Sequence, residues 1–132
     1  MGFLDIDYSD AVELKVFSAG SEVNLRIIDA DVKTSENTGG DYLRVDFEPI
    51  GEDMYKDIMH IFMLPTPNDR PKQANNRKLA IKKFCEAFKI TLDPSREVDE
   101  YMVGAEGWAI VREEDDAEFG TKNRIKEFIA PK

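Results

Sequence analysis

The sequence has one histidine, His60, and one cysteine, Cys85, among its 132 residues. A single cysteine excludes an internal disulfide and suits a reducing compartment. Neither residue lies in a recognisable pattern for nucleophilic catalysis, and no glycine-rich phosphate-binding motif is present. The chain is therefore not expected to be an enzyme, and no cofactor is expected.

Long apolar runs are also missing. No stretch approaches the roughly 18 apolar residues of a membrane-spanning helix, so no membrane partner is expected. The start of the chain, MGFLDIDYSD, is acidic and does not have the basic and apolar regions of a secretory signal. The acidic run EEDDAE (residues 113–118) does not have the glycine or the ligand spacing of a calcium loop, so we expect a solvated hairpin rather than a metal site.

Acidic residues dominate the chain, with a formal net charge of −9, but the charge is unevenly distributed. Residues 70–92 hold seven Lys or Arg against one acidic residue, and residues 119–132 hold four against one. Two basic islands in an acidic chain favour an anionic partner. Each island taken alone is also typical of ordinary solvated surface.

Hydrophobic periodicity predicts three strands in the first half of the chain. Residues 21–35 alternate, but the phase slips after Ile28, which indicates a bulge or a bend. Residues 41–49 alternate cleanly, with Leu43, Val45 and Phe47 predicted to face inward. Residues 57–64 are apolar on both faces, as in a covered or ligand-facing strand.

The second half is predicted to hold one helix and two strands. The helix is expected to begin after Asn75 or Asn76 and to bury a stripe of Ile81, Phe84, Cys85 and Phe88. Residues 107–113 and 122–130 are the remaining strands. This order is typical of the OB-fold, a mainly β, five-stranded, partly open barrel with one helix between strands three and four. An unrelated α+β sheet with one packed helix is the alternative.

We expect residues 1–20 to form an acidic lead-in and residues 21–132 to form the OB-fold domain. OB-folds generally bind oligonucleotides across the second and third strands. Tyr42 and Arg44 are predicted on the outward face of the second strand. If Met59, Ile61 and Met63 face the core, then His60 and Phe62 face outward on the third strand and complete a platform on which unpaired bases stack. Because this strand is apolar on both faces, a buried Phe62 is the alternative.

The last strand contains a row of cations. Lys122, Arg124 and Lys126 fall at every second position and are predicted to share one face, opposite Ile125 and Ile129. Such a row can neutralise a nucleic-acid backbone. Lysines that protect an exposed sheet edge against aggregation are the alternative interpretation.

Two further nucleic-acid contacts are predicted outside these strands. Phe119, in the hairpin loop before the last strand, is expected to close over a base. Arg77 belongs to the basic face of the helix and is a candidate phosphate contact.

Five segments carry a family resemblance. They are AGSEVNLRIIDADVKTSENTGGDYLRVDFEPI, IFMLP, NRKLAIKKFCEAF, VGAEGWAIV and FGTKNRIKEFIAP. In these segments the chain, from about Gly20 to Pro131, resembles a family of bacteriophage OB-fold single-stranded DNA-binding proteins, long catalogued as a phage domain of unknown function. The resemblance implies binding of single-stranded DNA without sequence preference in phage replication or recombination, with proteins of those processes as further partners, in the cytoplasm of an infected bacterial cell.

An acidic phage interaction protein that mimics DNA and inhibits a host protein is the alternative function. The net charge favours this alternative, whereas the two basic islands count against it. The sequence does not determine the oligomeric state.

Overall fold

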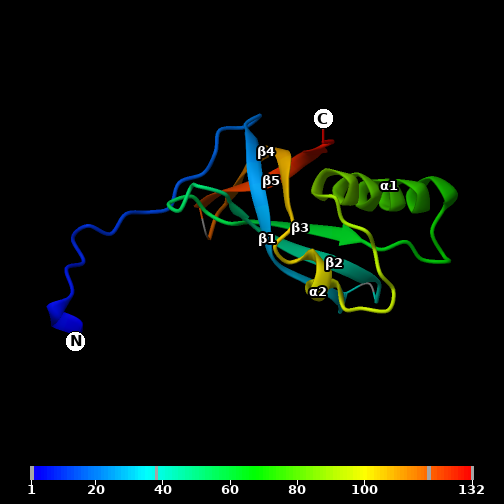
Figure 1. The fold of residues 1–132 in the computed structure, drawn as a ribbon, viewed down its shortest axis with the longest axis horizontal. Helices are drawn as coiled ribbons and strands as arrows, with labels where there is room; N and C mark the ends of the chain where they lie inside the picture. Colours follow the sequence, from blue (N-terminus) through cyan, green and yellow to red (C-terminus); the bar gives the residue numbers. More distant parts are fainter. Residues whose placement is uncertain (1, 38, 119, 132) are drawn as a thin grey trace.

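The computed structural model describes residues 2–37, 39–118 and 120–131. Its centre is a five-stranded antiparallel sheet with the order β3-β2-β1-β4-β5 (Figure 1). Two helices follow β3 in the chain, and a 3-10 helix lies near the N-terminus. The elements are η1 (Phe3–Asp5), β1 (Glu22–Thr34), β2 (Asp41–Pro49), β3 (Ile58–Met63), α1 (Pro71–Phe88), α2 (Val98–Met102), β4 (Glu106–Asp116) and β5 (Gly120–Ile129). The predicted class, mainly β with a long helix between β3 and β4, is confirmed.

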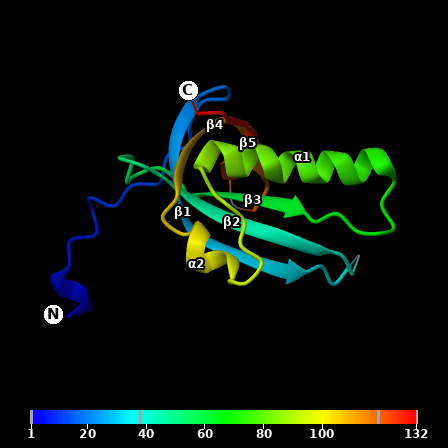
Figure 2. The same cartoon turned by 45° about the vertical axis from the view of Figure 1, so that its right-hand side comes forward.

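The sheet curls until its two edge strands, β3 and β5, lie near each other (Figure 2). Nη1 of Arg124 on β5 donates to the carbonyl oxygen of Met59 on β3 at 3.4 Å. The rings of His60 and Phe128 lie 5.6 Å apart across the same gap. Within the described ranges, no ladder of backbone hydrogen bonds joins these strands. The sheet is therefore barrel-like but not closed.

A bulge bends β1 at the position of the predicted phase slip. The pairing with β2 passes from Ile27 opposite Phe47 to Asp29 opposite Asp46, which leaves Ile28 without a partner in the register. An extra residue in one strand increases the local twist. The first part of β1 can therefore pair with β4, while the longer second part extends beside β2.

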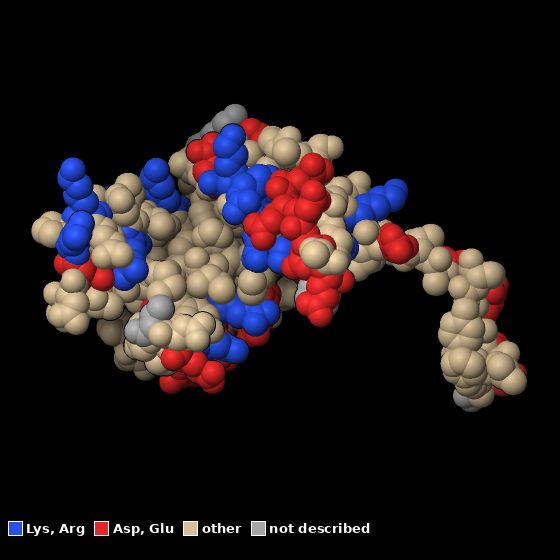
Figure 3. All heavy atoms as spheres, turned by 180° about the vertical axis from the view of Figure 1, so that it is seen from behind, with Lys and Arg blue, Asp and Glu red and all other residues tan. Residues whose placement is uncertain are grey.

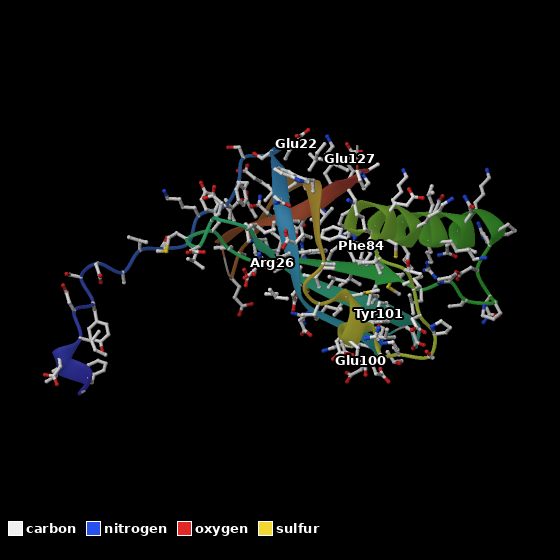
Figure 4. The ribbon with its side chains drawn as sticks, in the orientation of Figure 1. Glu22, Arg26, Phe84, Glu100, Tyr101 and Glu127 are labelled. Carbon is white, nitrogen blue, oxygen red and sulfur yellow. The ribbon has the colours of Figure 1, made fainter. Side chains whose placement is uncertain are left out.

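The core is built from phenylalanine rings of four elements. Phe47 of β2, Phe62 of β3 and Phe128 of β5 surround Phe84 of α1, whose ring centroid lies 6.1, 4.9 and 5.3 Å from theirs. Figure 4 shows Phe84 on the side of α1 that faces the sheet. The predicted apolar stripe of α1 is confirmed. The end of α1 packs closely against β4. A Cβ added at Gly107 of β4 would lie only 2.8 Å from the carbonyl oxygen of Ala87.

The start of α1 differs from the prediction, because the helix begins at Pro71 rather than after Asn75 or Asn76. Proline suits a first helical position, since its φ is already helical and its missing N–H would have no helical acceptor there. The short helix α2 was not predicted. Among the described residues, no helix is both long and apolar enough to cross a bilayer.

The chain before β1 has two parts. Residues 2–14 project away from the body (Figure 1) and bury none of their side chains. The chain joins the body at Lys15, whose N–H donates to the carbonyl oxygen of Met54 at 2.9 Å and whose carbonyl oxygen accepts from the N–H of Lys56 at 2.9 Å. The ring of Phe17 then stacks on Tyr55 at 4.2 Å.

Candidate nucleic-acid interface

The two faces of β3 are the reverse of the main prediction. Phe62 pairs with the inward-facing Leu43 and is only 3% exposed, whereas Ile61 pairs with Arg44 and is 44% exposed. The expectation that Phe62 faces outward is therefore wrong, and the alternative of a buried Phe62 is correct. The hydrophobicity of β3 gives no contrast between its faces. Its register with β2 and the rings of Phe84 and Phe128 determine which face is buried.

His60 lies on the same inward face as Phe62, but near the gap between β3 and β5. Its ring is half-buried, 4.4 Å from the ring of Phe62 and 5.6 Å from that of Phe128. Burial, together with the smaller effect of the nearby cations of Arg124 and Arg112, lowers the pKa of His60 from 6.5 to about 4. At neutral pH His60 is thus an uncharged flat ring rather than a cation.

A cavity of about 340 Å³ opens where β3 and β5 do not pair and α1 passes beside them. His60, Phe62 and Phe128 contribute to its lining, together with Lys83 of α1 and Lys126 of β5. We call this cavity the β3–β5 groove. Both lysines are exposed, and neither has an ion-pair partner within the part of the chain that the structure describes. Glu127 is the one carboxylate in this lining. The groove therefore combines aromatic rings with two cations that form no ion pair among the described residues.

The charge pattern around this region is visible from behind in Figure 3. An uncharged hollow lies between basic side chains on the α1 side and a group of mixed basic and acidic side chains on the opposite side. A hollow with cations on its borders is the kind of surface that attracts a polyanion, even on a protein of net charge −9.

A second bulge separates the cations of β5. The pairing with β4 passes from Ile125 opposite Val111 to Glu127 opposite Ile110, so Lys126 is the extra residue. Lys126 borders the groove, whereas Lys122 and Arg124 lie on the outer face. The prediction that all three cations share one face is wrong, because the bulge interrupts the alternation. Ile129 also differs from the prediction: it pairs with the exposed Trp108, whereas Ile125 is buried.

Lys122 and Arg124 are already paired with carboxylates. Nζ of Lys122 lies 3.1 Å from Oδ2 of Asp116, and Nε of Arg124 lies 3.5 Å from Oε2 of Glu114. Both side chains are also less than one-third exposed. A phosphate would have to compete with these partners, so the outer face of β5 is a weaker anion site than the sequence indicates.

Tyr42 and Arg44 lie on the outward face of β2, as predicted. Tyr42 is half-buried, and Nε of Arg44 lies 3.4 Å from Oδ1 of Asp46. The sheet itself separates these two side chains from the inward-facing His60 and Phe62. The structure therefore does not assemble the four residues into the single platform that the sequence predicts.

Arg77 has a structural partner. Its Nη1 donates to both carboxylate oxygens of Asp69 at 3.0 Å, and the side chain of Asp69 is only 7% exposed. This pair connects α1 to the loop before it, so Arg77 is a poor candidate for a phosphate contact. The predicted contact Phe119 lies outside the described residues.

Of the residues that line the groove, only His60, Phe62 and Lys126 were predicted from the sequence as contacts; Leu79, Lys83 and Phe128 are among those that were not. Lys83 was visible only as one member of a basic island. Phe128 lies on the inward face of β5 because the bulge at Lys126 shifts the alternation of the strand. No feature of the local sequence indicates that bulge.

Other chemistry finds little support among the described residues. They contain no group of three or more His, Cys, Asp or Glu that could hold a metal ion. Burial raises the pKa of the Cys85 thiol, so this side chain is an unreactive part of the core.

Neither a scan against protein-family models nor a search of curated proteins finds a match to this chain. The family resemblance of the sequence therefore stays a prediction.

Proposed function

We propose that this protein is an OB-fold protein that binds single-stranded DNA without sequence preference, in phage DNA replication or recombination. The observation that carries the proposal is the β3–β5 groove, which is lined by the rings of His60 and Phe128 and by Lys83 and Lys126, two cations without an ion-pair partner among the described residues. Proteins that bind single strands combine aromatic rings, on which bases stack, with cations that follow the backbone.

The fold supports the same proposal. A curled five-stranded antiparallel sheet with a long helix between β3 and β4 is the element order of the OB-fold. The bulged β1, which takes part in both halves of the sheet, is consistent with that topology. The phage setting depends on the family resemblance alone.

In this proposal the protein does no bond chemistry. Lys83 and Lys126 contact phosphates from opposite sides of the groove and release their condensed counterions. Bases turn toward His60 and Phe128, which stack as neutral rings at neutral pH. The carboxylates that dominate the rest of the surface repel a duplex, whose bases are not free to stack.

The test uses His60 as a reporter. Because it is the only histidine of the chain, its imidazole signals in an NMR spectrum are unambiguous. An oligonucleotide of about 30 residues at low salt should shift these signals, and a duplex of the same length should compete poorly. Equal affinity for duplex, or no binding to any single strand, would contradict the proposal. A chain that binds no nucleic acid but captures a host protein would instead support the acidic interaction protein.

A further inference from the structure

The N-terminal segment, residues 2–14, is the most exposed apolar part of the molecule. Six of the fourteen large apolar side chains that the structure shows as exposed lie in it, from Phe3 at 75% and Leu4 at 89% exposure to Leu14. It also contains four acidic residues and no Lys or Arg. Soluble monomers rarely expose such a concentration of apolar surface, so the segment is built to contact something.

Part of the segment is already ordered as a compact turn. The rings of Phe3 and Tyr8 lie 5.2 Å apart, and the hydroxyl of Tyr8 donates to the carbonyl oxygen of Phe3 at 2.8 Å. This turn holds two aromatic rings beside the carboxylates of Asp5 and Asp7. A preformed turn loses less conformational entropy when it docks.

A surface that is also apolar, but of opposite charge, lies along α1. A cavity of about 760 Å³ is formed by α1 and the chain that follows it, with Ile81, Ile90 and Leu92 in its lining; Leu92 is 53% exposed. Lys78, Lys82 and Lys89 also line it, and none of these lysines has an ion-pair partner among the described residues. Glu86 is the one carboxylate in this lining. We call this cavity the α1 groove.

The α1 groove is separate from the β3–β5 groove. The first uses positions 78, 81, 82, 85 and 86 of the helix, together with Lys89 just after its end, and the second uses positions 76, 79, 80 and 83. At 3.6 residues per turn these two sets lie on opposite sides of α1. A ligand in one groove therefore leaves the other accessible.

We propose that the α1 groove binds the N-terminal segment of a second copy of this chain. The apolar side chains of the segment match the isoleucines and Leu92 of the groove, and its four carboxylates match the three lysines, which form no ion pair with any described residue. The segment leaves the body on the side opposite α1 (Figure 1), so it is directed away from the groove of its own chain.

Such a contact is head-to-tail, because the segment of one copy meets the groove of the next. Contacts of this kind form rings or open filaments. A filament of this type would coat a DNA strand cooperatively, but the inference does not depend on DNA binding.

The experiment compares two charge reversals by sedimentation velocity over a range of concentrations at low salt. Lys78→Glu/Lys82→Glu changes the groove, and Asp7→Lys/Asp10→Lys changes the segment; all four residues are exposed. The wild-type chain should self-associate as its concentration rises, and each variant should associate roughly tenfold more weakly. A mixture of the two variants should recover association, because the intact segment of one fits the intact groove of the other.

Matched controls carry the same changes of charge elsewhere on the surface. Lys33→Glu/Lys72→Glu and Asp31→Lys/Asp53→Lys should associate like the wild-type chain. A wild-type chain that stays monomeric at every concentration, variants no weaker than their controls, or a mixture that does not recover association would each overturn the inference. DNA binding is tested separately from self-association. For this purpose the affinity of Asp7→Lys/Asp10→Lys for a single oligonucleotide is measured at low protein concentration.

Discussion

The side-chain amide of Asn123 on β5 forms two hydrogen bonds with the backbone of Phe17. Its Oδ1 accepts from the N–H of Phe17 at 2.7 Å, and its Nδ2 donates to the carbonyl oxygen of Phe17 at 2.9 Å. Asn123 is the only polar residue among the fully buried ones described, at 4% exposure. Through this contact the chain that enters from the N-terminal segment is fixed to the barrel-like body.

Asn123→Ala should therefore lower the free energy of unfolding by about 1–3 kcal/mol, because the N–H and carbonyl of Phe17 lose buried partners. Urea unfolding measures this loss, and hydrogen exchange at residues 15–17 should become faster. Asn75→Ala, on the exposed side of α1, is the matched control and should have little effect. An unchanged unfolding midpoint for Asn123→Ala would mean that water replaces the amide at no cost.

Phe62 and Ile61 are neighbours in the sequence that face opposite sides of β3. Phe62→Ala should lower the free energy of unfolding by about 3–5 kcal/mol, because it leaves a cavity among the rings of the core. Ile61→Ala should change it by no more than about 0.5 kcal/mol. Urea unfolding of both variants measures the difference, and Phe62→Leu keeps the comparison possible if Phe62→Ala does not fold. A larger loss at Ile61 than at Phe62 would reverse the assignment of the two faces.

The depressed pKa of His60 gives the stability a specific pH dependence. Between pH 6.5 and about 4 the unfolded chain binds a proton at His60 and the folded chain does not, so stability falls as the pH decreases through this range. The total loss should reach up to about 3 kcal/mol. The difference between wild type and His60→Gln in urea unfolding at several pH values isolates this contribution from the carboxylates. An imidazole that titrates near pH 6.5 in the folded protein would contradict the prediction.

The salt dependence of DNA affinity distinguishes the groove from the outer face of β5. Each phosphate contact on a single strand contributes about −0.7 to the slope of log affinity against log salt. Lys83→Ala/Lys126→Ala should therefore flatten this slope by about 1.4. Lys122→Ala/Arg124→Ala makes the same change in net charge but removes cations already paired with Asp116 and Glu114, so its effect should be smaller.

A titration of both double variants at several salt concentrations makes this comparison. If the two flatten the slope equally, only the overall charge matters. A larger effect of Lys122 and Arg124 would restore the phosphate path that the sequence alone predicts.

The sequence by itself determined the elements whose two faces differ. The alternation of β2 placed Leu43, Val45 and Phe47 inward, and the slip of phase at Ile28 located the bulge of β1. The spacing of Phe84, Cys85 and Phe88 identified the buried side of α1. In each case the contrast between apolar and polar positions is local, so a short stretch of sequence contains it.

Only the tertiary structure decided the arrangement of the candidate site. β3 is apolar on both faces, so its register with β2 and the rings packed behind it determine that Phe62 is buried. The bulge at Lys126 depends on how β5 pairs with β4, and the carboxylates that neutralise Lys122 and Arg124 come from that partner strand. Arg26 also forms ion pairs with carboxylates of neighbouring strands, Glu48 of β2 and Glu106 of β4. The availability of a cation depends on its neighbours in space, and those neighbours come from distant parts of the chain.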